Sequence, residues 1–328
     1  MRSIWKQLAF ALLLGVVFPS FLIRSVPVMQ NRQPVTNVTS PDTAPESSVP
    51  QQGEQTSTML LPVLMKDGTV QHMDVDAYLT AVVLREMPAD FELEALKAQA
   101  IVARTYALKR YTEGGKHTDN AVCTDSACCQ GYRSEEEYLS SGGSEEAIAK
   151  IRNAVTSTSG MVLTYQNQLI DATYFSCSGG KTEDAQAVWG SDVPYLQSVE
   201  SPGEEKAAHY TDTVTFSATE FASLLGQRLD GAAGTWLEEV TYTDGGGVAT
   251  IRICGKTYQG TTIRQRLGLR STAFVMTAVG NTITVTTKGF GHRVGMSQYG
   301  ADAMAVRGNS CEQVLAHYYP GTNIVPYG

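Results

Sequence analysis

The chain has 328 residues, 42% of them apolar, and a formal net charge of −8 at pH 7. This length suffices for one large domain or two small ones with a proper hydrophobic core. No dense block of Lys and Arg interrupts the acidic balance, so nucleic acid is not an expected partner, because its phosphates would be repelled.

The N-terminus predicts a membrane anchor over residues 1–27. Arg2 and Lys6 precede an apolar run from Leu8 to Ile23, which has about the length of a short membrane span or of a signal-peptide core. No clear cleavage site of small residues follows, which favours an anchor that stays uncleaved. We therefore expect a single span in the cell membrane, with the rest of the chain outside the cytoplasm.

Residues 28–57 predict a disordered tether. They are rich in Pro, Gln, Ser, Thr and Glu and contain no aromatic residue, a composition that buries too little apolar surface to fold. The remainder, residues 58–328, is expected to fold and to work close to the membrane surface.

The segment 75–87 predicts an amphipathic helix with a carboxylate at its end. The apolar stripe consists of Val75, Tyr78, Leu79, Val82 and Val83. Glu86 continues this stripe, because eleven steps of about 100° return to within roughly 20° of the start, and Pro88 ends the helix. A carboxylate on a buried face is either half of an ion pair or a general acid with a raised pKa, and helical phase alone favours the ion pair.

A second helix is predicted from about Asp90, as N-cap, to Tyr111. Its many alanines allow close approach by a neighbouring element. Lys97 and Arg104 lie on one half-apolar face, where they could pair with Glu86 or bind an anionic or hydroxyl-rich substrate. The alternative is that both side chains pack their stems and keep their charged ends in water.

Four potential metal ligands or disulfide partners follow within thirteen residues, His117, Cys123, Cys128 and Cys129. Outside the cytoplasm a disulfide is one interpretation, although adjacent cysteines do not bond each other without strain. A zinc site is the other, and four protein ligands would make it structural. The spacing alone leaves both open. The other three cysteines, Cys177, Cys254 and Cys311, are expected to be small buried residues.

Two later segments predict site loops. Tyr174 and Ser176 begin a Ser/Gly-rich turn after a β-like run that starts at Met161. Near the C-terminus, His292 lies in a glycine-rich loop, and Gln298 opens a helix that should end near Gly308. Between them, three glycines at 245–247 predict a hairpin in a β-rich part.

Together these segments resemble the stage II sporulation protein D family. The motifs that carry the resemblance are YLTAVVLREMP at 78–88, EALKAQAIVARTYA at 94–107, SCSGGKT at 176–182, the loop at 291–300 and YYPG at 318–321. The resemblance covers about residue 57 to the end. It implies a lytic transglycosylase that cleaves peptidoglycan between N-acetylmuramic acid and N-acetylglucosamine in peptide-stripped strands, leaving 1,6-anhydro ends. It also implies action during engulfment in sporulation, with the stage II sporulation proteins P and M as partners.

The family's catalytic glutamate carries over to Glu86, which would serve as the only acid/base because the sugar's own 6-hydroxyl is the nucleophile. Substrate-binding residues are expected to be Lys97, Arg104, Tyr174, Ser176, His292 and Gln298. Some family members hold zinc at the positions of His117, Cys123 and Cys129. Cys128 stands where they have His, so the resemblance favours a structural zinc ion on all four. Arg293 replaces the usual Gly and adds a cation to the presumed substrate loop.

We expect an α+β fold in which a helical and β catalytic core and a second, β-rich part flank a substrate cleft. The approximate divisions are 58–205 for the core, 206–285 for the β-rich part and 286–328 for a C-terminal segment that returns to the site. Two other functions remain open, a non-catalytic cell-wall binding protein that stimulates a partner amidase and a zinc-dependent hydrolase.

Overall fold

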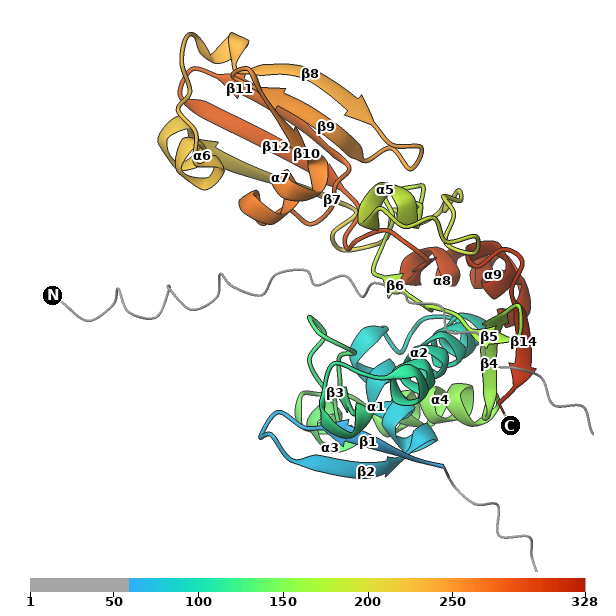
Figure 1. The fold of residues 1–328 in the computed structure, drawn as a ribbon. Coiled ribbons are helices and arrows are strands. Elements are labelled where there is room, and N and C mark those ends of the chain that lie inside the picture. The colour runs from blue at the N-terminus through green and yellow to red at the C-terminus, as the bar shows by residue number, and fades with distance from the viewer. Residues whose placement is uncertain (1–58, 328) are drawn as a thin grey trace, which may run out of the picture. The chain divides into compact units, whose positions relative to one another are not determined.

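The computed structural model describes residues 59–327, so the predicted anchor and tether lie outside the described residues. None of the helices in this range is long and apolar enough to cross a membrane. Helices and several small sheets alternate along the chain (Figure 1), which confirms the α+β class.

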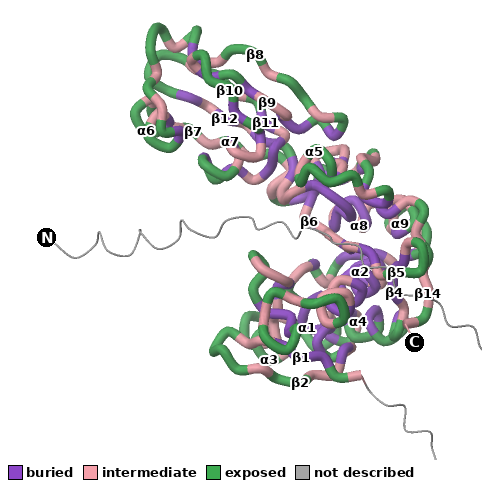
Figure 2. Tube along the Cα trace, in the orientation of Figure 1, coloured by how far each residue is buried: buried purple, intermediate pink, exposed green. Residues whose placement is uncertain are grey.

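Three helices form the centre of the first core, α1 (Val75–Glu86), α2 (Leu93–Glu113) and α4 (Glu145–Thr156). They lie side by side in Figure 1, and Figure 2 shows buried residues along most of α1 and α2. The Asp74 side chain starts α1 by accepting a hydrogen bond from the N–H of Ala77, and Met87, in extended conformation before Pro88, ends it. The predicted first helix is confirmed.

The second predicted helix is confirmed, but its start is not. Glu92, rather than Asp90, occupies the N-cap position, and its side chain makes no capping bond. Its backbone N–H instead donates to Asp302 at 2.7 Å. A tertiary contact therefore replaces the local cap that the sequence suggested.

The remaining elements complete this core. They are β1 (Leu60–Leu64), β2 (Val70–Asp74), the short helix η1 (Thr118–Asn120), β3 (Val122–Cys123), α3 (Glu135–Ser140), β4 (Met161–Tyr165), β5 (Gln168–Leu169), β6 (Tyr174–Phe175), α5 (Ala185–Trp189), β13 (Met296–Ser297), α8 (Gln298–Val306), α9 (Cys311–Tyr318) and β14 (Asn323–Pro326). The β-like run predicted from 161 to 174 is broken because Gln166 and Asn167 have φ of 51° and 63° and turn the chain. The helix predicted from Gln298, with Gly308 after it, is confirmed.

The pairing of β6 with β13 brings the two predicted site loops together. Met296 lies opposite Tyr174, and Ser297 opposite Phe175, in a parallel pair. Glu204 strengthens this junction, because its buried carboxylate accepts hydrogen bonds from Ser178 and Ser297. Segments more than a hundred residues apart thus form one wall.

A second hydrophobic cluster occupies the β-rich part. Two three-stranded sheets, in the orders β10-β9-β8 and β11-β12-β7, carry it together with two helices. The elements are β7 (Thr211–Ser217), α6 (Ala218–Leu225), η2 (Ala233–Thr235), β8 (Leu237–Tyr242), β9 (Val248–Ile253), β10 (Lys256–Gln259), α7 (Gly260–Leu267), β11 (Phe274–Val279) and β12 (Thr282–Lys288). The predicted hairpin at 245–247 joins β8 to β9 in an antiparallel pair, as expected.

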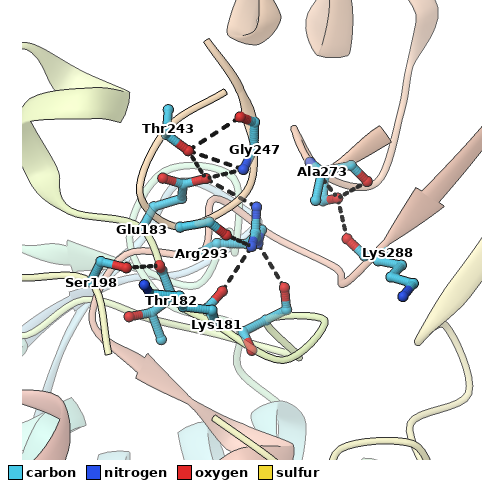
Figure 3. A network of polar contacts seen from close by, with 12 residues as sticks. Lys181, Thr182, Glu183, Ser198, Thr243, Gly247, Ala273, Lys288 and Arg293 are labelled. Carbon is cyan, nitrogen blue, oxygen red and sulfur yellow. Dashed lines mark hydrogen bonds and ion pairs between the residues drawn. The ribbon is translucent and has the colours of Figure 1, made fainter. Parts of the chain in front are cut away.

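Arg293 ties the β8–β9 turn to the core (Figure 3). Its guanidinium pairs with Glu183 at 3.0 Å and donates to the backbone oxygens of Lys181 and Gly245. Glu183 in turn accepts from the N–H of Gly247 at 2.9 Å. The Arg293 side chain is 2% exposed. It therefore does not add the free positive charge that we had expected in the presumed substrate loop. The backbone of Arg293 has a φ of 69°, a conformation that Gly adopts most easily.

Candidate functional site

A cavity of about 520 Å³ lies at the end of α1, within the range of roughly 300–1,000 Å³ typical of small-ligand sites. Its lining residues are Arg85, Glu86, Tyr106, Ser126, Cys129, Ala172, Thr173, Tyr174, Phe175, Ser176, Phe290, Gly291, His292 and Gln298. The site thus gathers the predicted catalytic residue and four of the six predicted substrate-binding residues. None of these lining residues falls in 206–285, and Phe290 and Gly291 come from the segment that directly follows the β-rich part.

Among the described residues that line the cavity, Glu86 is the only acidic one. One carboxylate oxygen accepts a hydrogen bond from the backbone N–H of Gly131 at 2.6 Å. Burial raises the pKa of Glu86, although the Gly131 N–H, the charge of Arg85 and a hydrogen bond from Gln298 each act to lower it. Burial wins because water is withdrawn from the charged form, so the carboxyl keeps its proton to higher pH than a free Glu.

The loop that holds Glu86 follows the His and Cys cluster. Asp125 closes a turn by accepting from the backbone N–H groups of Cys128 and Cys129. Gln130, which is buried, accepts a hydrogen bond from the hydroxyl of Tyr78 and donates one to that of Tyr174, both at 3.2 Å. The next residue is Gly131, so this loop fixes the position of its N–H relative to Glu86.

The cluster itself fits a tetrahedral metal ion. The ligand atoms of His117, Cys123, Cys128 and Cys129 all lie within 4.8 Å of one another, and Nε2 of His117 is 3.4 Å from Sγ of Cys128. Zinc–sulfur bonds of about 2.3 Å in a tetrahedron place ligand atoms roughly 3.7 Å apart. All six cysteines are free thiols in the described residues. The donor set is therefore suited to zinc, with adjacent cysteines both facing the centre.

His292 is a neutral wall of the cavity. Burial lowers its pKa to about 4, with the charge of Arg264 as a smaller cause. Its Nδ1 accepts from the N–H of Val294, and its ring meets those of Phe175 and Trp189 with centroids 5.6 and 5.3 Å away. An imidazole held in this way cannot supply a proton near neutral pH.

Three further predicted substrate residues also line the cavity. Tyr174 lies in β6, Ser176 lies in the turn after β6, and Gln298 is the first residue of α8. Gln298 is buried, its amide nitrogen donates to Oε1 of Gln99 at 3.5 Å, and it acts to lower the pKa of Glu86. Their assignment to substrate binding stays a prediction.

The structure does not bring Lys97 and Arg104 to this cavity. Lys97 pairs with Glu94 at 2.7 Å. Arg104 is 1% exposed and pairs with Asp76 at 2.8 Å, and its other nitrogen donates to the backbone oxygen of Thr158. A guanidinium that is buried and paired cannot reach a substrate, and removing one partner of such a pair typically costs roughly 3–5 kcal/mol. The prediction that Arg104 binds substrate or pairs with Glu86 is therefore corrected to a role in the core.

Sequence reasoning missed several residues at the site. Arg85 and Tyr106 both lie within the recognised motifs, next to residues that were considered, but neither was singled out. Burial raises the pKa of Tyr106 to about 12, so its hydroxyl stays protonated. Gln130 and Gly131 carry no periodic or motif signal, and only their place directly after the cysteines could have drawn attention to them.

Comparison with known proteins gives consistent matches. Residues 65–165 match a family model described as "Stage II sporulation protein". The stage II sporulation protein D of Bacillus subtilis (strain 168) is 40% identical over 332 residues, which cover 97% of this chain and 96% of that protein. The protein of the same name from Bacillus amyloliquefaciens is 44% identical over 260 residues, 78% of this chain and 75% of that protein. A Bacillus subtilis protein named amidase enhancer is 29% identical over 303 residues, 76% of this chain and 40% of that protein.

Replacing Gly131 by Ala should displace the Glu86 carboxylate. A Cβ at position 131 would lie 2.6 Å from Oε1 of Glu86 and 2.7 Å from Cγ of Arg85. If Glu86 serves as the predicted catalytic acid, turnover should fall by roughly 10²-fold, as happens when a catalytic group is misplaced by about 1 Å. Gly234→Ala, with no atom within 4 Å of the new Cβ, serves as the matched control. Equal activity of both variants would contradict the assigned role of the Gly131 N–H.

Replacing Glu86 by Gln should stabilise the fold at neutral and alkaline pH. The pKa of Glu86 is raised in the folded state, chiefly by burial, so the parent loses stability as pH rises through that folded pKa. Gln has no charge to bury and keeps an oxygen for the Gly131 N–H. Calorimetry should show a higher Tm for the variant at pH 8. Below about pH 4 the two Tm values should not differ, because Glu86 is then protonated in both the folded and the unfolded chain.

Glu94→Gln should change Tm at pH 8 in the opposite direction and serves as the control for Glu86→Gln. Burial acts to raise the pKa of Glu94, but the hydrogen bond from Lys97 and that from the N–H of Cys311 leave it lowered. The parent therefore gains stability above the unfolded pKa, and Glu94→Gln should have a lower Tm at pH 8. A Glu86→Gln variant that shares this behaviour would refute the raised pKa.

Proposed function

Because this chain belongs to the stage II sporulation protein D family, a family of sporulation proteins, we propose that it is a peptidoglycan lytic transglycosylase. Its substrate in this proposal is the bond between N-acetylmuramic acid and N-acetylglucosamine in peptide-stripped glycan strands. Its product is a strand with a 1,6-anhydro end.

The presence of one carboxylate at the cavity carries the proposal. Glycosidases that use water normally need two carboxylates, about 5–9.5 Å apart, one to protonate the leaving oxygen and one to activate water or to attack the sugar. Glu86 is the only acid among the described lining residues. A transglycosylase needs no second one, because the nucleophile belongs to the substrate.

The proposed reaction is balanced without water. The Glu86 carboxyl gives its proton to the glycosidic oxygen, and the bond from C1 of the muramic acid residue to that oxygen breaks. The 6-hydroxyl of the same sugar forms a bond to C1, and its proton passes to the Glu86 carboxylate. The acid is thereby restored, and the leaving N-acetylglucosamine carries the first proton away.

The surroundings of Glu86 support this role. Burial keeps its carboxyl protonated to higher pH, and the Gly131 N–H holds it in place at 2.6 Å. His292 is neutral, with a pKa of about 4, and the pKa of Tyr106 of about 12 is too high for proton exchange near neutrality. Glu86 is the lining group best suited to both steps.

We assign a structural zinc ion to His117, Cys123, Cys128 and Cys129, whose ligand atoms lie within 4.8 Å of one another. When bound, it would cross-link the turn that precedes Gln130 and Gly131, with four protein ligands and no open position. Its contribution to catalysis would be indirect, through the loop that holds Glu86.

We further propose that the N-terminal segment anchors the chain in the cell membrane, with the catalytic region outside the cytoplasm. The family resemblance suggests the stage II sporulation proteins P and M as partners during engulfment. The name of the 29% identical amidase enhancer supports a second candidate, a cell-wall binding protein that stimulates an amidase without cleaving glycan.

These functions are tested by incubating purified peptide-stripped glycan with the chain and identifying the products. We expect the parent chain to release fragments with 1,6-anhydro ends, detected by mass spectrometry, and Glu86→Gln to be slower by at least about 10²-fold because its only acid/base is lost. Absence of any cleavage by the parent would favour the binding protein. Hydrated reducing ends that disappear with chelator would favour a zinc hydrolase.

Removing the metal should weaken activity without changing the product. Elemental analysis of the purified chain should find one zinc ion per molecule. A chelator should lower both Tm and turnover, because the loop of Gln130 and Gly131 loses its cross-link, while the remaining product keeps its anhydro end. No zinc, together with no free thiol among the three cysteines, would overturn the metal site.

A further inference from the structure

The cavity contains one permanent cation, Arg85, which precedes the acid Glu86 in the last turn of α1. Within residues 59–327, no other Lys or Arg lines the cavity, and His292 is neutral. The side chain of Arg85 is exposed, whereas that of Glu86 is half-buried. The cavity lining therefore presents one positive charge, on the residue next to Glu86.

This charge is available to a ligand. In the part of the chain that the structure describes, Arg85 forms no ion pair, while Lys97 and Arg104 are each paired with a carboxylate. Its stem lies against the backbone of Gly131, because a Cβ added there would come within 2.7 Å of Cγ of Arg85. The same loop that holds Glu86 thus also confines the stem of Arg85, an exposed residue that lines the cavity.

The chemistry of a guanidinium selects a carboxylate, to which it can donate two parallel hydrogen bonds. In a glycan of alternating N-acetylated sugars, only muramic acid offers one, on the lactyl group at its O3. That carboxylate is free when the stem peptide has been removed and is an uncharged amide when the peptide is present. A chain with a net charge of −8 would also repel an anionic strand without a local cation.

We propose that Arg85 recognises the free lactyl carboxylate of muramic acid and is the residue that makes the cavity prefer peptide-stripped strands. This inference rests on the proposed function, because it places a glycan in the cavity. It assigns to Arg85 the recognition of an anionic substrate that we had expected of Lys97 and Arg104.

Two matched oligosaccharides separate charge recognition from every other effect of a substitution. One is a peptide-free tetrasaccharide of alternating N-acetylglucosamine and N-acetylmuramic acid with free lactyl acids, and the other is the same compound with lactyl N-methylamides. The measured quantity is the ratio of kcat/KM for the acid to kcat/KM for the amide, using the purified full-length chain. Changes in folding or in the protonation of Glu86 affect both substrates and cancel in the ratio.

For the parent we expect a ratio of about 10, the lower end of what a charge-assisted hydrogen-bonded pair contributes. Arg85→Gln should bring the ratio to about 1, Arg85→Lys should restore part of it, and Arg85→Glu should reverse it. Most of the change should appear in KM, because the carboxylate is bound alike before and during reaction. Lys97→Gln, which removes a cation that does not line the cavity, should keep the parent ratio.

A parent ratio of 1, or a ratio in Arg85→Gln equal to that of the parent, would overturn the role of Arg85 while leaving the transglycosylase intact. If the parent cleaves neither compound, the proposed function fails instead. Calorimetric binding of the two oligosaccharides to full-length Glu86→Gln, with and without Arg85→Gln, then decides the inference without turnover. Preference for the acid that disappears with Arg85 supports it, and equal binding of both compounds refutes it.

Discussion

The hydrogen bond from the N–H of Gly131 to Glu86 is the contact on which the site depends. At 2.6 Å it joins the end of α1 to the loop that directly follows the His and Cys cluster. The turn at Asp125 and the hydrogen bonds of the buried Gln130 side chain hold this loop in place. A residue larger than Gly would meet the carboxylate directly. The helix therefore presents the acid, and the loop sets its final position.

The same neighbours oppose one another in setting the proton affinity of Glu86. Burial raises its pKa, whereas the Gly131 N–H, Arg85 and Gln298 lower it. A group that must donate a proton and then take one back works best when neither state is strongly preferred. In the proposed reaction Arg85 would serve the substrate as well, and its charge limits how far burial can raise the pKa. The same neighbouring residues thus determine both the position and the proton affinity of the Glu86 carboxyl group.

The sequence predicts much of the helical core and less of the site. The stripe from Val75 to Val83 placed Glu86 on the inward face, because a helix repeats regularly. The same reasoning failed for Arg104, because α2 is buried on nearly all sides. The helical periodicity of the sequence cannot say which side of such a helix faces a partner and which faces water. Gln130 and Gly131 lie in a loop whose path follows from tertiary contacts, so no local pattern indicates them. The cluster of His117 with three cysteines was visible from composition, but only the structure shows that both adjacent cysteines face it.

The origin of the oxygen at C1 of the product tests the central claim most directly. In water enriched in oxygen-18, attack by the sugar's own 6-hydroxyl introduces no solvent oxygen, so the account predicts anhydro ends of unchanged mass. A second carboxylate, or a metal-bound hydroxide, would deliver water to C1 and give a reducing end that is heavier by the label. Unlabelled anhydro product formed by the parent and lost in Glu86→Gln would agree with a single acid/base, and labelled reducing ends would contradict it.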